Sequence, residues 1–158
     1  MPRESVSLLS LAQEAAASLS AAAQAQNVTL TVNGTAGTLT GVRRLLSETV
    51  RNLCENAVKY NVPGGSVTVE TGETAQDVTL TVRDTGIGIP AAEQSRIFER
   101  FYRVDKARSR AAGGTGLGLA IVRDTVEKRG GTVEAANRPG GGAVFTVRWP
   151  WREGGGQT

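Results

Sequence analysis

The sequence contains no histidine, so this chain cannot itself offer a histidine as a phosphoacceptor, a general base or a metal ligand. Its single cysteine, Cys54, excludes an internal disulfide and a zinc site built from several cysteines. Aromatic residues make up only 4% of the chain, which disfavours a surface for stacking nucleic-acid bases. The sequence contains no run of about 18 apolar residues that could cross a membrane, and we expect no signal peptide after Met1.

The residues that are present are typical of one folded domain. The chain has 158 residues, of which 39% are hydrophobic and 21% are charged, enough to build a core. The formal net charge of +3 is mildly basic and fits a polyphosphate ligand or an acidic partner protein. It is only a weak indication of nucleic acid, and we expect no nucleic-acid partner.

Hydrophobic periodicity predicts an α+β fold, a two-layer sandwich in which helices cover one face of a mixed sheet. Helices are expected at 7–25, 41–60 and 117–129, and strands at 28–32, 66–71, 77–83, 131–136 and 142–149. Residues 86–113 are irregular apart from a short helix near 91–99, and this length favours a functional or mobile segment. We expect one domain over 5–150 and a disordered glycine-rich tail over 151–158.

Each predicted helix has an apolar face. The expected faces are Leu8, Leu11, Ala15, Leu19 and Ala22 in the first helix, Leu46, Thr49, Val50, Leu53 and Ala57 in the second, and Leu117, Ile121, Val122, Thr125 and Val126 in the third. In the strand at 77–83, Val78, Leu80 and Val82 point the same way as Asp84. This carboxylate therefore ends an apolar face, where it needs a partner.

Two asparagines on the long helix are candidate metal ligands. Asn52 and Asn56 lie one turn apart, so their amide oxygens project in nearly the same direction. An amide oxygen is a neutral, hard ligand that suits Mg²⁺ bound together with phosphate oxygens. Lys59 adds a cation one turn later, and Tyr60 adds a flat ring. The alternative is a pair of solvated or capping asparagines, which is the commoner case for such a pair alone.

Two glycine-spaced loops follow. Asp84 can accept a hydrogen bond from an exocyclic amine such as that of adenine, and Gly86 and Gly88 let the backbone approach a planar base. The alternative is an Asp-Thr-Gly turn that ends a strand. Residues 114–119 read Gly-Thr-Gly-Leu-Gly-Leu and open a helix, where free N–H groups favour phosphate. The spacing matches neither a Rossmann loop nor a P-loop, and a flexible glycine hinge is the alternative.

The segment between the loops contains aromatic and basic residues. Phe98, Phe101 and Tyr102 have helical spacing and are interpreted as packing anchors rather than a cofactor site. Arg103 and Lys106 are candidates to reach phosphate, although solvated charges are the default for either residue.

In this order the segments resemble the catalytic and ATP-binding domain of bacterial sensor histidine kinases, within the group shared with gyrase, Hsp90 chaperones and MutL. Residues 52–61 resemble the N box, 84–90 the G1 box, 98–103 the F box and 114–119 the G2 box. The resemblance covers about residues 5–150, and four boxes in family order are a strong signal. It implies a mixed sheet backed by three helices, with ATP under a mobile lid over about 91–113.

The resemblance also implies roles for single residues. Asn56 would be the main Mg²⁺ ligand with Asn52 beside it, Lys59 would contact phosphate, and Tyr60 would stack near the adenine. Asp84 would accept from the adenine amine, with Gly86, Gly88 and Ile89 in the G1 box that lines the base. Arg103 would meet the γ-phosphate. The triphosphate would lie in the G2 box, which consists of Gly114, Thr115, Gly116, Leu117, Gly118 and Leu119.

One position separates activities within the group. The ATPases carry a water-activating glutamate at the first N-box position, where this chain has Asn52. Because an amide cannot take a proton from water, we expect phosphoryl transfer to a protein side chain rather than efficient hydrolysis.

The resemblance places the accepting histidine on a separate dimerising helical hairpin upstream. We therefore expect the chain to be a fragment, itself monomeric, from the cytoplasmic side of a membrane-anchored receptor that pairs with a response regulator. Two rival functions stay open: an anti-sigma-type serine/threonine kinase with the same boxes, and a docking module without catalysis.

Overall fold

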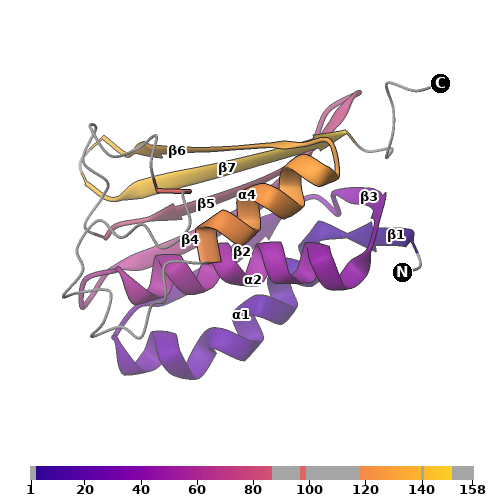
Figure 1. Cartoon of the computed structure of the whole chain (residues 1–158). Coiled ribbons are helices and arrows are strands. Elements are labelled where there is room, and N and C mark those ends of the chain that lie inside the picture. The colour runs from indigo at the N-terminus through magenta and orange to yellow at the C-terminus, as the bar shows by residue number, and fades with distance from the viewer. Residues whose placement is uncertain (1–2, 87–96, 99–117, 140, 151–158) are drawn as a thin grey trace.

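The computed structural model describes residues 3–86, 97–98, 118–139 and 141–150. Within these ranges a five-stranded sheet is covered on one face by three helices, and a two-stranded ribbon lies at one end (Figure 1). This arrangement confirms the predicted α+β sandwich of two layers.

The predicted helices and strands within the described ranges are all found, with ends shifted by one or two residues at most. The helices are α1 (Leu8–Ala25), α2 (Arg43–Lys59) and α4 (Gly118–Lys128). The strands are β1 (Glu4–Ser7), β2 (Thr29–Gly34), β3 (Thr38–Gly41), β4 (Ser66–Glu73), β5 (Asp77–Asp84), β6 (Thr132–Asn137) and β7 (Ala143–Pro150). The short helix expected near 91–99 and the tail over 151–158 lie outside the described residues, except for Ile97 and Phe98.

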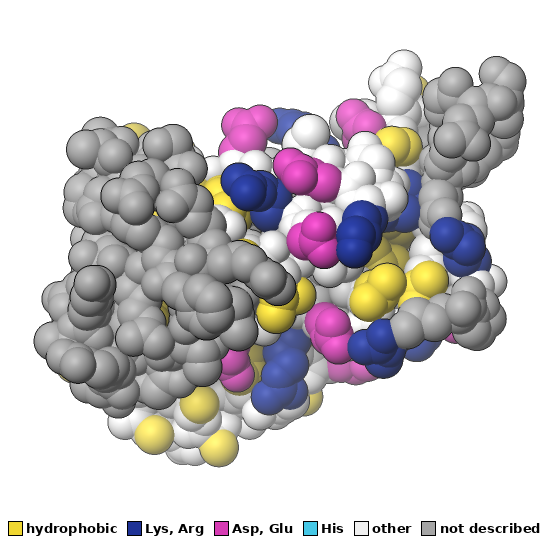
Figure 2. Space-filling view, viewed as in Figure 1, with side chains coloured by type: hydrophobic (Ala, Val, Ile, Leu, Met, Phe, Trp, Pro, Cys, Tyr) yellow, Lys and Arg dark blue, Asp and Glu magenta, His cyan; other side chains and the backbone are white. Residues whose placement is uncertain are grey.

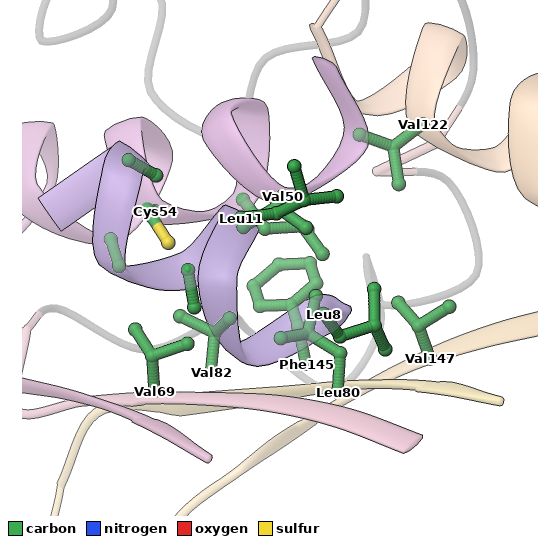
Figure 3. Packing of buried hydrophobic residues seen from close by; sticks show 14 of the residues in the cluster. Leu8, Leu11, Val50, Cys54, Val69, Leu80, Val82, Val122, Phe145 and Val147 are labelled. Atoms are coloured by element: carbon green, nitrogen blue, oxygen red, sulfur yellow. The ribbon is translucent and has the colours of Figure 1, made fainter. Parts of the chain in front are cut away.

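The sheet has the strand order β2-β4-β5-β7-β6, so β5 is its central strand. The β2–β4 pair is parallel and the other three pairs are antiparallel, which makes the sheet mixed as predicted. Val82 on β5 lies opposite Val69 on β4 and Phe145 on β7, and these residues face the helices (Figure 3). Asp84 ends this central strand, opposite Val67.

The core lies between the sheet and the helices (Figure 3). All five residues predicted for the apolar face of α2 are buried. On α1, Ala23 is buried where Ala22 was expected. On α4, Val122 and Val126 are fully buried, but Ile121 is 40% exposed, so its prediction as a core residue is wrong. The buried face of α4 is narrower than the apolar face predicted from its sequence, because only the side that faces the sheet and α2 is covered.

The β1–β3 ribbon was not predicted. Each strand has four residues, and its two strands bury Val6 and Leu39, which lie opposite each other. Such short strands carry no recognisable alternation, and their pairing joins segments that a whole helix separates. The Arg129 side chain ties the ribbon to the main sheet, because Nε donates to Thr40 O at 2.7 Å and Nη2 to Pro150 O at 2.9 Å.

Candidate functional site

Asp84 is a buried carboxylate, with 6% of its surface exposed. Its Oδ1 accepts hydrogen bonds from the backbone N–H of Gly86 at 2.8 Å and of Ala143 at 3.1 Å. No described residue donates to Oδ2. Burial raises the pKa of Asp84, while the two N–H groups and the charge of Arg138 oppose that rise. The predicted need for a partner is therefore met at one oxygen, which leaves the other for an external donor.

A hydrogen-bonded cluster behind Asp84 joins α2 to the sheet. Buried Asn61 donates from Nδ2 to Ser66 O at 2.9 Å and accepts at Oδ1 from the N–H of Val62 at 2.8 Å. Thr85 Oγ1 donates to Asn61 Oδ1 at 3.1 Å and accepts from the N–H of Ser66 at 2.8 Å. The end of α2, the start of β4 and the end of β5 are thereby fixed relative to one another.

Gly86 is needed for close approach of the chain to itself at the end of β5. A Cβ on Gly86 would lie 2.4 Å from the carbonyl oxygen of Tyr60 and 3.1 Å from Asp84 Oδ1. Any larger residue would therefore displace either the end of α2 or the carboxylate. The approach of Gly86 to a base remains a prediction.

The two candidate ligand amides lie inside α2. Asn52 and Asn56 are both half-buried, and neither side chain makes a hydrogen bond to a described residue. They are not capping residues, because the helix ends after Lys59 with Tyr60 as its C-cap. Lys59 pairs with Glu55 at 3.6 Å on the same helix. The amides are therefore available to a ligand, and the capping alternative is wrong.

The β6–β7 hairpin supplies contacts that the sequence analysis missed. Ala143 donates its backbone N–H to Asp84 Oδ1, and Arg138 Nη1 donates to Asp84 O at 3.1 Å. Gly142 has φ +93°, and a Cβ there would lie 1.9 Å from Asp84 O. In the sequence this segment reads only as a glycine-rich turn, and its distance along the chain from Asp84 hides the contact. Asn61 and Thr85 lie within the N-box and G1-box segments, and this position was the available signal for them.

Part of the predicted site lies outside the described residues. These residues are Gly88, Ile89, Arg103, Gly114, Thr115, Gly116 and Leu117, together with most of the expected lid over 91–113. Gly118 is the first residue of α4, and Leu119 is half-buried against the core. Phe98 is buried and its ring meets Phe145 edge to face, with centroids 6.2 Å apart, which confirms it as a packing anchor.

A separate open cavity of about 500 Å³ lies at the other end of α2. Charged residues that pair with one another line it, including Arg43 with Glu4 at 3.4 Å and Arg44 with Glu48 at 3.0 Å. Figure 2 shows the same mixture more widely, because acidic and basic side chains are interspersed over the described part of this face. We therefore centre the candidate site on Asp84 and the end of α2.

Comparison with known proteins now identifies the fold. The family described as "Histidine kinase-, DNA gyrase B-, and HSP90-like ATPase" matches residues 41–153. The chain belongs to this ATPase family. Sensor-like histidine kinase SenX3 of Mycolicibacterium smegmatis is 38% identical over 148 residues, which are 93% of this chain and 38% of SenX3. This ATPase domain therefore spans well under half the length of that relative.

Solved structures agree with the assignment. The mycobacterial sensor histidine kinase MprB superposes on this ATPase domain with a TM-score of 0.81 and 28% identity, over 96% of this chain and 99% of that one. Full-length ShkA in complex with AMPPNP gives a TM-score of 0.83 at 27% identity, over 97% of this chain and 32% of ShkA. Histidine kinase ThkA, in complex with the response regulator TrrA, gives 0.78 at 21% identity, over 94% and 42%. The chain is thus a catalytic domain of the sensor histidine kinase type.

The described residues contain neither a membrane-spanning helix nor a cluster of metal-binding side chains. No helix in the described ranges is both long and apolar enough to span a bilayer. In the same residues, no group of three or more His, Cys, Asp or Glu side chains could hold a metal ion.

Proposed function

We propose that this domain binds ATP with Mg²⁺ and transfers the γ-phosphoryl group to a histidine on a separate dimerisation domain of its full-length protein. One observation carries the proposal: Asp84 is buried, its Oδ1 is held by two backbone N–H groups, and no described residue donates to its Oδ2. A carboxylate in this state is matched by a ligand that presents an N–H donor at the end of β5.

Adenine presents such a donor in its exocyclic amine. The amine would donate to Asp84 Oδ2, while Gly86, which has no side chain, keeps its N–H close to Oδ1 without a clash. Tyr60 closes α2 beside Gly86 and would stack near the base. Gly88 and Ile89, outside the described residues, are proposed to line the same base.

The amides of α2 fit a magnesium triphosphate. Both are half-buried and make no hydrogen bond to the described residues, so no existing contact has to break. Asn56 would be the main ligand, with Asn52 beside it, and bound Mg²⁺ would neutralise charge on the phosphates. Lys59 could turn from Glu55 to phosphate at little cost, because the pair is partly exposed and such pairs contribute little.

Several proposed roles fall on residues outside the described ranges. Arg103 would meet the γ-phosphate, and the backbone N–H groups of Gly114, Thr115, Gly116 and Leu117 would bind the triphosphate, with Gly118 and Leu119 continuing into α4. Because Asn52 cannot act as a base toward water, these residues would favour transfer over hydrolysis by positioning and charge neutralisation.

The relatives support the partners. The AMPPNP complex of ShkA supports ATP as the nucleotide, and the TrrA complex of ThkA supports a response regulator as the downstream partner. We propose that this domain works on the cytoplasmic side of a membrane-anchored receptor, whose upstream hairpin carries the histidine.

Two measurements test the proposal. The first is calorimetric titration with ATP and Mg²⁺ of the parent chain, of Asp84→Ala, and of Asp77→Ala as a matched control at the opposite end of β5. We expect binding to be lost in Asp84→Ala and kept in the control. Equal affinity of Asp84→Ala and the parent would refute the base contact.

The second measurement is transfer of labelled phosphate to the histidine-bearing hairpin of the full-length protein, supplied in trans. A phosphohistidine product is lost in acid, whereas a phosphoserine product survives it. An acid-stable product on an anti-anti-sigma protein would replace the histidine kinase by the serine/threonine alternative. Absence of any nucleotide binding would leave only a docking role.

A further inference from the structure

The hairpin between β6 and β7 brings a charged side chain to the back of the site. Arg138 is half-buried, and its Nη1 donates to the backbone carbonyl oxygen of Asp84 at 3.1 Å, across 54 residues of sequence. It belongs to none of the motifs that the sequence analysis identified. Its contact is with the main chain of the residue whose carboxylate is proposed to bind the base.

The hairpin backbone determines where Arg138 lies. The N–H of Arg138 donates to Gly142 O at 2.9 Å, and the N–H of Gly141 donates back to Arg138 O at 3.2 Å. Gly142 is in contact with the same Asp84 carbonyl that accepts from Arg138, as its missing Cβ allows. Ala143, the next residue, donates to Asp84 Oδ1 at 3.1 Å. The hairpin therefore contacts Asp84 at both its carbonyl and its carboxylate.

The surroundings of Asp84 make Arg138 the electrostatic partner. Burial raises the pKa of Asp84, and the positive charge of Arg138 acts against that rise. On β4 the opposite residue is apolar Val67. At the end of α2 the titratable groups are Tyr60 and Lys59, and Lys59 pairs with Glu55 on its own helix.

We propose that Arg138 is a positioning residue for purine binding, which clamps the end of β5 so that the charged Asp84 directs Oδ2 toward the base. This inference rests on the proposed function, because it assumes that Asp84 accepts from the adenine amine. Arg138 itself contacts neither base nor phosphate and acts through Asp84.

The experiment compares Arg138→Met, Arg138→Lys and the control Arg148→Met, which removes the same charge from an exposed position further along β7. Binding of ATP and of adenosine is measured from acid to neutral pH. The carboxyl carbon-13 shift of Asp84 is titrated in the nucleotide-free proteins. Thermal unfolding reports whether each variant is folded.

At neutral pH we expect Arg138→Met to weaken ATP and adenosine binding by the same factor, about tenfold, which is the lower end of the range for one charge-assisted hydrogen bond. On acidification, Arg138→Met should lose ATP binding at a higher pH than the parent does. The midpoint of the Asp84 titration should rise by the same number of pH units. Arg138→Lys should restore most of the nucleotide affinity and most of the parent's Asp84 titration midpoint. Arg148→Met should match the parent in both measurements.

Other results would overturn the inference. A loss for ATP without a loss for adenosine would make Arg138 a phosphate contact. Lower thermal stability with an unchanged Asp84 titration and unchanged binding would leave only a structural role. If the parent binds neither ligand, the proposed function fails. The Asp84 titration then still decides whether Arg138 acts on that carboxylate.

Discussion

Replacing Asp84 by asparagine should separate the requirements of the fold from those of the site. Because Oδ1 accepts from the N–H groups of Gly86 and Ala143, an asparagine must keep its carbonyl oxygen there. Its NH₂ group then takes the place of Oδ2 and faces the adenine amine with a second donor. Loss of a hydrogen bond to a charged acceptor costs about 1.5–3 kcal/mol, and the unmatched donor costs about 1–3 kcal/mol more. Together these terms weaken ATP binding by about two orders of magnitude or more.

The same substitution should leave the fold as stable or more stable at neutral pH. The folded-state pKa of Asp84 lies above its ordinary value of 3.8, so the folded protein binds the proton more tightly than the unfolded chain. This carboxyl therefore reduces stability as the pH rises from the unfolded pKa through the folded one. Asparagine carries no charge, so the gain in the free energy of unfolding of Asp84→Asn over the parent should develop across that pH interval and stay constant above it.

Calorimetric titration with ATP and thermal unfolding at acid and neutral pH measure both effects, with Asp77→Asn as the control on the same strand. The reasoning is refuted if Asp84→Asn binds ATP as tightly as the parent. It is also refuted if the variant is less stable than the parent at neutral pH, because the burial of charge would then not dominate at this position.

Four further predictions follow from single contacts. Gly142→Ala should lower the free energy of unfolding by more than about 2 kcal/mol, since φ +93° and a Cβ 1.9 Å from a backbone oxygen are both unfavourable; denaturant titration would measure the loss. Asn61→Ala should cost about 1–3 kcal/mol by the same assay, because it removes a buried amide that donates to Ser66 O and accepts from the N–H of Val62. Burial raises the pKa of Cys54 to about 12, so a thiol reagent should label it only after denaturation, and labelling of the native protein would contradict this. Asn56→Ala should weaken ATP binding in the presence of Mg²⁺ but not in its absence, with unchanged thermal stability, because the half-buried amide makes no hydrogen bond to the described residues.

The helices and strands of the main sandwich could be predicted because their apolar residues repeat with the periods of helix and strand. The face of α2 and the alternation that ends in Asp84 were both confirmed. Ile121 was wrong because its exposure depends on how far the covering layer extends over α4, which periodicity does not report. The β1–β3 ribbon was missed because each strand has only four residues, and because its pairing and its place in the core are set by segments that are distant in the sequence.

The sequence by itself determined the candidate groups of the site and their local setting, because spacing along one helix or one strand sets which side chains point together. That spacing made Asn52, Asn56 and Asp84 candidates, and the resemblance to sensor histidine kinases then implied their roles. Only the tertiary structure decided which Asp84 oxygen is occupied and what supports it. Its neighbours Arg138 and Ala143 come from a hairpin more than fifty residues away, and such contacts arise from strand pairing across the sheet rather than from any local pattern.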